Sequence, residues 1–201
     1  AEMLVSAADT PPVPKPQYEH GEIRVVGASA DEPVSKQLSV AAASAYLDHG
    51  NAAWNGARGC VSCHTNGIYM TVRPALTKSL GQPEEAARKY FVTTLESLEK
   101  TPHEDLLKST KPAQVIYTAA GLSEWDAHVT GKLSPETDRA LRLMLSIQLE
   151  TGTFGTLDCW PPYESDAYHE ATVAAMAIAT APGWNASVKD DSQKQKIDRL
   201  L

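Results

Sequence analysis

Proline and glycine divide most of this chain into short apolar segments, and this punctuation limits the fold more than any other feature of the sequence. Pro83, Pro112 and Pro135 each stand at the start of a segment, where proline suits the first turn of a helix. Gly131 and the pair Pro182-Gly183 follow segments, as residues that end helices do. Within the segments apolar residues recur at helical spacing, and no stretch alternates as a strand would. We therefore predict an all-α fold of antiparallel helical hairpins with short connections.

These signals place the individual helices. Ser165 is predicted to cap a helix that runs through YHEATVAAMAIA, and Ser134-Pro135 starts the helix before it. Thr101 and Glu104 belong to the stretch TPHE, which predicts a capping box. The other expected helices cover residues 39–54, 84–98, 112–128 and 192–201.

The first 37 residues lack the helical pattern and are expected to be irregular. The stretch TPPVPKPQYEHG places four prolines between Pro11 and Pro16, which favours extended backbone with few hydrogen bonds. Two interpretations stay open, a strap laid over the domain or a partner, and a disordered leader. We therefore predict an extended Pro-rich N-terminal arm over residues 1–37 and a single helical domain over residues 38–201.

The formal net charge of −7 argues against a nucleic-acid-binding protein, because nothing resembles a basic stripe. Such a charge suits docking onto a basic protein surface, and it serves simple solubility equally well. The longest apolar run, residues 171–182, is too short to span a membrane, so membrane association is expected only through partners. The chain begins at Ala1, as either a mature exported protein or a trimmed fragment would.

Cys60, Cys63 and His64 form a C-x-x-C-H motif within the stretch GARGCVSCHTNG. This motif is the attachment signature for c-type haem. Its two thiols add across the two haem vinyl groups, and the spacing of the cysteines suits the separation of those groups. The adjacent histidine then lies under the porphyrin plane and binds iron through its imidazole. We therefore predict one covalently bound haem c, with His64 as an iron ligand.

Three other uses of the motif compete with haem. A redox dithiol needs a thioredoxin-like βαβ setting, which the helical pattern does not supply. A zinc site would recruit Cys159 with the two motif cysteines, but His64 directly follows one of them and could hardly share the same tetrahedral ion. A structural disulfide is compatible with an exported protein. Cys159, beside Trp160, is most simply interpreted as a buried free thiol.

The sixth iron ligand has several candidates, and an open sixth position also remains. His169 lies in the first turn of an apolar helix, just after PPYESDAY, and is the preferred candidate. Arg58 and Arg73 flank the motif and are expected either to neutralise haem propionates or to be ordinary surface arginines. The remaining candidate ligands are His20, His49, His103, His128, Met70, Met144 and Met176.

Longer stretches of the chain resemble a bacterial group of squalene-cyclase-like helical proteins that carry a haem-binding C-x-x-C-H motif. The stretch AAASAYLDHGNAAWNGARGCVSCHTNGIYMTVRPAL is similar to the N-terminal part of that group. QLETGTF is similar to its Q-x-x-x-G-x-W motif, with Phe154 in place of tryptophan, and CWPPYESDAYHEATVAAMAIATAP is similar to a later stretch. The resemblance runs from about residue 38 to the end and implies an α/α toroid with the haem near its start. A chain of 201 residues would supply about half of one.

This chain departs from the cyclases in its acidic residues. Triterpene cyclases protonate their substrate with a D-x-D-D motif, which does not occur here. The nearest acidic cluster, ESDA at residues 164–167, is better suited to cap a helix through Ser165 and Asp166. We therefore expect no cyclase chemistry, and no enzymatic activity is predicted.

Electron transfer by a monohaem c-type cytochrome is the leading functional hypothesis. A covalently held, six-coordinate haem changes oxidation state with little rearrangement, and it would exchange electrons with a protein redox partner or a larger complex. An accessory subunit of a membrane redox or photosynthetic complex, with the Pro-rich arm as a tether, is the alternative. A haem-based sensor of a small ligand is a third. Since cytochrome maturation normally occurs outside the cytoplasm, we expect the periplasm or the outer face of a membrane.

Overall fold

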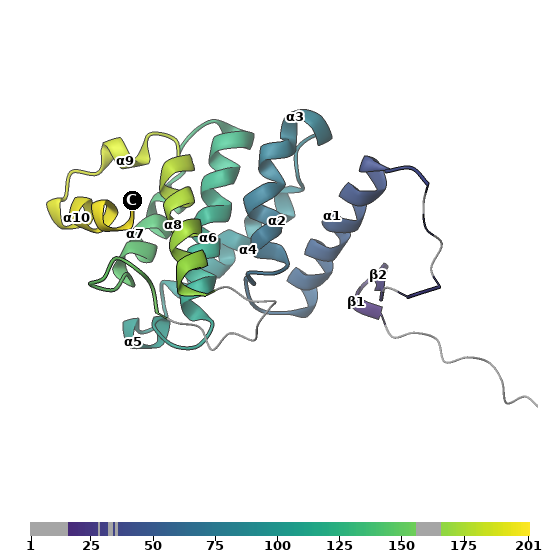
Figure 1. Cartoon of the computed structure of the whole chain (residues 1–201), viewed down its shortest axis with the longest axis horizontal. Coiled ribbons are helices and arrows are strands. Elements are labelled where there is room, and N and C mark those ends of the chain that lie inside the picture. The colour runs from purple at the N-terminus through teal and green to yellow at the C-terminus, as the bar shows by residue number, and fades with distance from the viewer. Residues whose placement is uncertain (1–15, 28, 32–33, 35, 156–165) are drawn as a thin grey trace, which may run out of the picture.

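The prediction of an all-α fold is confirmed by the computed structural model, which describes residues 16–27, 29–31, 34, 36–155 and 166–201 (Figure 1). Within these ranges, helices account for the ordered elements apart from one two-stranded hairpin. The helices are α1 (Val40–Ala57), α2 (Asn66–Val72), α3 (Thr77–Leu80), α4 (Glu85–Leu98), α5 (His103–Leu106), α6 (Lys111–Trp125), α7 (Pro135–Ser146), α8 (Ala167–Thr180), α9 (Trp184–Ser187) and α10 (Asp191–Leu200), with a 3-10 turn at Pro74–Leu76 and a π-helical turn at Asp126–Thr130.

Serine and aspartate side chains begin several of these helices, as the sequence indicates. The Ser39 hydroxyl accepts a hydrogen bond from the Ala42 backbone N–H, and Ser134 does the same for Thr137. Asp166 is the N-cap of α8, where its carboxylate accepts from the His169 backbone N–H. The predicted cap at Ser165 lies outside the described residues.

The capping box predicted at TPHE is wrong. The Thr101 hydroxyl donates to the Ser97 backbone carbonyl at 3.1 Å, so it satisfies the end of α4 and not the start of α5. Pro102 is the N-cap residue of α5, and its side chain has no hydrogen-bonding group. Because the last carbonyls of a helix lack partners within it, a nearby hydroxyl readily bonds to them.

The prediction of an irregular N-terminal arm is wrong for residues 16–26. Strand β1 (Pro16–His20) pairs antiparallel with strand β2 (Ile23–Val26) through a turn at Gly21. The hairpin lies against α1 (Figure 1). This contact gives the short, β-branched second strand a surface that the sequence pattern does not reveal. The prolines before Pro16 lie outside the described residues.

Helix α6 is the centre of the core. Every residue from Pro112 to Trp125 is buried, because α2, α4, α7 and α8 pack around the helix (Figure 1). Gly121 makes the closest of these contacts, since a Cβ there would lie 2.7 Å from the Phe91 ring and 2.8 Å from the Met70 Cβ. The π-helical turn continues α6, and Gly131 ends it in the left-handed conformation with φ +69°.

The QLETGTF stretch ties the end of α7 to α10. The Gln148 side-chain amide donates to the backbone carbonyls of Gly152, at 2.9 Å, and Lys196, at 3.0 Å. Gly152 approaches the Arg199 backbone so closely that a side chain would collide with it, and Phe154 is buried in the core. The stretch therefore has a structural role in the described fold. Among the described helices, none combines the length and hydropathy needed to cross a membrane.

Candidate functional site

The C-x-x-C-H motif lies in the connection between α1 and α2. Two aromatic side chains on neighbouring helices hold this connection by its backbone. The Trp54 indole N–H donates to the Cys60 carbonyl at 3.0 Å, and the Tyr90 hydroxyl donates to the Arg58 carbonyl at 3.0 Å. The motif is thereby fastened to α1 and to α4.

Asn66 organises the motif from within. It is fully buried, and its side-chain oxygen accepts hydrogen bonds from the Ser62 backbone N–H at 2.7 Å and the Ser62 hydroxyl at 3.3 Å. Its side-chain nitrogen donates to Asn55 at 2.9 Å and to the Cys60 carbonyl at 3.2 Å. One amide therefore fixes the backbone on both sides of Val61, between the two cysteines. Asn66 was not predicted from the sequence, although a polar Thr-Asn pair directly after the motif was its signal.

Gly67 lets the motif close tightly onto α2 and α6. Its backbone N–H donates to the Ser62 carbonyl at 2.9 Å. A Cβ at this position would collide with the same carbonyl and would lie 2.9 Å from the Tyr117 ring of α6. A side chain at position 67 would therefore push the motif away from the central helix.

The two motif cysteines are free thiols, and both are half-buried. Burial raises the pKa of the Cys60 thiol, and the positive charges of Arg58 and Lys111 oppose this effect only in part. The thiol is therefore protonated at neutral pH. Lys111, the first residue of α6, is a second cationic neighbour of the motif and was not predicted from the sequence.

His64 is exposed, and its contacts fix the direction of its ring. The ring Nδ1 lies 2.9 Å from the Thr65 hydroxyl oxygen. The Trp54 ring meets the imidazole edge-on, with 5.1 Å between ring centroids. Within the described part of the chain, the other nitrogen, Nε2, has no hydrogen-bond partner in the protein. The histidine therefore presents one unoccupied nitrogen outward from the motif.

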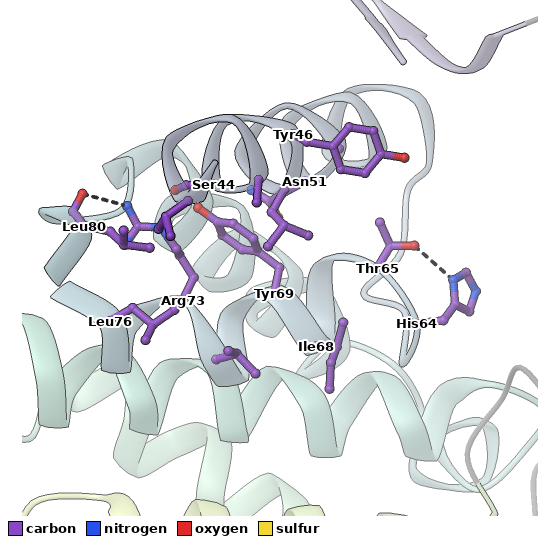
Figure 2. Close-up of a pocket in the computed structure, with 15 residues that line it drawn as sticks. Ser44, Tyr46, Asn51, His64, Thr65, Ile68, Tyr69, Arg73, Leu76 and Leu80 are labelled. Carbon is purple, nitrogen blue, oxygen red and sulfur yellow. Dashed lines mark hydrogen bonds between the residues drawn. The ribbon is translucent and has the colours of Figure 1, made fainter. Parts of the chain in front are cut away.

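A mostly apolar groove of about 480 Å³ runs between α1 and α2, and His64 stands at one end of it (Figure 2). Figure 2 shows the imidazole turned away from Tyr69 and Arg73. The Tyr69 hydroxyl donates to Asp48 at 2.7 Å, and burial together with this carboxylate raises the tyrosine pKa. Aliphatic side chains are the largest group in the groove walls, among them Val40, Leu47, Ile68, Val72, Leu76 and Leu80.

The two arginines predicted near the motif have different surroundings. Arg58 is exposed, and its guanidinium lies 5.9 Å from the centre of the Trp54 ring, so it remains accessible to an anionic group. Arg73 is buried, donates to the backbone carbonyls at Gly81 (2.9 Å) and Leu80 (3.4 Å), and forms an ion pair with Asp48 at 3.4 Å. Arg73 therefore lines the groove with a guanidinium already engaged by the protein.

His169, the preferred sixth ligand, is separate from the groove that His64 lines. It is exposed at the start of α8, and its Nε2 lies 2.9 Å from the Tyr117 hydroxyl of α6. The structure therefore does not bring His169 and His64 together through that groove. The other candidates divide into buried core residues (Met70 and Met144), an exposed methionine (Met176) and exposed histidines (His49, His103 and His128); the side chain of His20 is not described.

The described residues do not support a zinc site at the motif. Over these ranges, no group of three or more histidine, cysteine or acidic side chains is arranged to hold a metal ion. A tetrahedral zinc site needs such a convergence of ligands. Cys159, the third cysteine in that alternative, lies outside the described residues.

A buried carboxyl follows His169 in α8. Glu170 is fully buried, and neither of its side-chain oxygens has a hydrogen-bond partner among the described residues. Burial, with a smaller contribution from the negative charge of Asp166, raises the pKa of Glu170 from 4.5 to about 8. The folded protein therefore holds this carboxyl in its neutral form at neutral pH.

Replacing Glu170 with glutamine is expected to stabilise the protein at alkaline pH. A raised pKa in the folded state gives stability that is present below pH 4.5 and is lost as the pH rises through 8. The variant should remove about 4 kcal/mol of the decline in unfolding free energy between pH 5 and pH 9. Urea unfolding across this range measures the effect, with exposed Glu96→Gln as control; parallel pH profiles for Glu170→Gln and the unchanged protein would contradict the prediction.

No protein-family model, curated protein or solved structure matches this chain. The resemblance to squalene-cyclase-like proteins therefore stays a prediction, and so does the toroid that it implies. No match therefore bears on the chemistry of the site.

Proposed function

We propose that this protein is a monohaem c-type cytochrome that transfers electrons through a haem held by Cys60, Cys63 and His64. One observation carries the proposal. A buried hydrogen-bond network fixes a loop that holds two free thiols beside an exposed imidazole with an unoccupied Nε2. These are the groups that covalent attachment and iron ligation need.

The thiols of Cys60 and Cys63 can form both thioether bonds to haem without a further reactant. Each thiol S–H would add across one vinyl double bond, with the sulfur bonding to one carbon and the hydrogen to the other. The addition consumes no oxidant or reductant. A thiol that is protonated at neutral pH, as Cys60 is, also resists oxidation before attachment. Iron supplies the redox chemistry, and His64 Nε2 would be its protein ligand.

The surroundings of the motif suit electron transfer. The loop is fastened by Trp54, Tyr90 and Asn66, so the iron ligand can keep its position when the charge of the site changes. Arg58 and Lys111 place positive charge beside Cys60, where haem propionates or an acidic patch of a partner would be attracted. Arg73 is a weaker candidate for this role because its guanidinium is already engaged.

The second axial ligand, the partner and the location are further parts of the proposal. His169 would have to release the Tyr117 hydroxyl or bind through Nδ1. A protein redox partner or a larger complex, at the periplasmic side or outer face of a membrane, follows from covalent haem attachment. If the sixth position is open, a sensor of small ligands is the alternative, since the groove walls contain no imidazole or thioether apart from His64.

Thioether counting tests the proposal directly. Protein produced with the c-type cytochrome maturation machinery should give a pyridine haemochrome spectrum with two thioether bonds. Cys60→Ser and Cys63→Ser should each give a one-thioether spectrum, and the double variant should lose covalent haem. Cys159→Ser, outside the motif, is the matched control and should keep both bonds. Absence of covalent haem from the unchanged protein would overturn the proposal.

A further inference from the structure

Among the described residues, the Thr65 hydroxyl makes one hydrogen bond, and its partner is the His64 imidazole. Thr65 is the N-cap residue of α2, yet its side chain makes no capping hydrogen bond. Its oxygen lies 2.9 Å from His64 Nδ1. The hydroxyl is therefore committed to the imidazole rather than to the helix that it precedes.

The backbone of Thr65 is fixed on both sides, so its hydroxyl is held in place. The Thr65 N–H donates to the Ser62 hydroxyl at 3.1 Å, and the Thr65 carbonyl accepts from the Tyr69 N–H at 2.9 Å. A β-branched side chain adds stiffness at its first torsion. The Trp54 ring, edge-on to the imidazole, limits rotation of His64 from another direction. The hydrogen bond is thus built into the motif.

We propose that Thr65 is a positioning residue that fixes the His64 tautomer and sets the reduction potential of the bound iron. The inference rests on the proposed function, because it concerns the iron ligand of that same site. When the hydroxyl oxygen accepts the Nδ1 proton, Nε2 carries the lone pair that binds iron. Donation of that proton makes the imidazole more electron-rich, which favours the oxidised iron and lowers the potential.

Valine tests this inference because it keeps the shape of threonine and removes the hydroxyl. Since the Thr65 side chain does not cap α2, Thr65→Val should cost the helix little. The haem-loaded variant should have a higher midpoint potential and a lower iron–histidine stretching frequency than the unchanged protein. Thr65→Ser, which restores the hydroxyl, should return both values toward those of the unchanged protein. Thr71→Val, near the end of α2, removes a hydroxyl whose described hydrogen bond goes to the Ile68 carbonyl, and it is the matched control.

The outcomes separate this inference from the proposed function. If the unchanged protein carries no covalent haem, the proposed function fails. If haem is attached and Thr65→Val leaves both the potential and the stretching frequency unchanged, the role of Thr65 fails alone. If the Thr65→Val variant takes up no haem, the test is the exchange rate of the His64 Nδ1 proton in the haem-loaded protein without the substitution. Slow exchange supports the hydrogen bond, and exchange as fast as that of an exposed imidazole overturns it.

Discussion

Replacing Asn66 with alanine is expected to abolish two-thioether haem attachment while the protein keeps its helical content. The amide of Asn66 makes hydrogen bonds to Ser62, Cys60 and Asn55, and all of its polar atoms are used. Without it, the Ser62 backbone N–H loses its acceptor in a buried setting, which costs about 1–3 kcal/mol. The loop would then sample other shapes, and the two thiols would no longer be held for attachment.

The measurement combines the pyridine haemochrome spectrum with circular dichroism. Asn185→Ala is the matched control, because Asn185 also lies in the first turn of a helix but is exposed. That control should retain both thioether bonds. Asn66→Asp keeps an acceptor oxygen and loses both donors, so it should also fail to attach the haem correctly. Two thioether bonds and an unchanged unfolding temperature in Asn66→Ala would show that the motif does not depend on this network.

Replacing Gly121 with alanine is expected to destabilise the protein by about 2 kcal/mol, because the added methyl group overpacks the core. The methyl would lie 2.8 Å from the Met70 Cβ, an atom that moves only with the backbone of α2. It would also lie 2.7 Å from the Phe91 ring. Relief therefore requires α2 to shift away from α6, and the motif precedes α2 directly. Urea unfolding of the haem-free protein measures the change in unfolding free energy.

Replacing Gly50 with alanine is expected to change the unfolding free energy in the opposite direction. It lies within α1, and a Cβ there would have no neighbouring atom within 4 Å. Gly50→Ala is therefore expected to stabilise the protein by about 0.5–1 kcal/mol through helix propensity alone. Equal effects of the two substitutions would contradict the close packing of α6 against α2.

Most helices were predictable because their limits are local. Ser39, Pro135 and Gly131 act on residues within one or two turns, so the sequence places α1, α6 and α7 within a few residues. The hairpin at residues 16–26 was not predictable, because its strands are short and lie against α1. The TPHE stretch misled for a related reason. Thr101 lies between the end of α4 and the start of α5, so its hydroxyl could bond to either helix. In the structure it donates to the Ser97 carbonyl of α4.

The candidate site was also predictable only in part from the sequence. Its chemistry depends on Cys60, Cys63 and His64, whose types and spacing are visible in the sequence. Asn66 was not found, because its role depends on Asn55 from the preceding helix. Arg58 and Arg73 flank the motif in the sequence and were assigned the same role. The structure separates them, because Arg58 is exposed and Arg73 is buried.

The helical class and the reactive groups of the motif are visible in the sequence, because both follow from residue types over a few neighbouring positions. The tertiary fold sets which contacts hold those groups. It buried Asn66 beneath the motif, set Gly67 against Tyr117 of α6, and directed His169 toward the Tyr117 hydroxyl. Burial and close contact depend on segments far apart in the chain, and a short pattern contains no information about the distance between them.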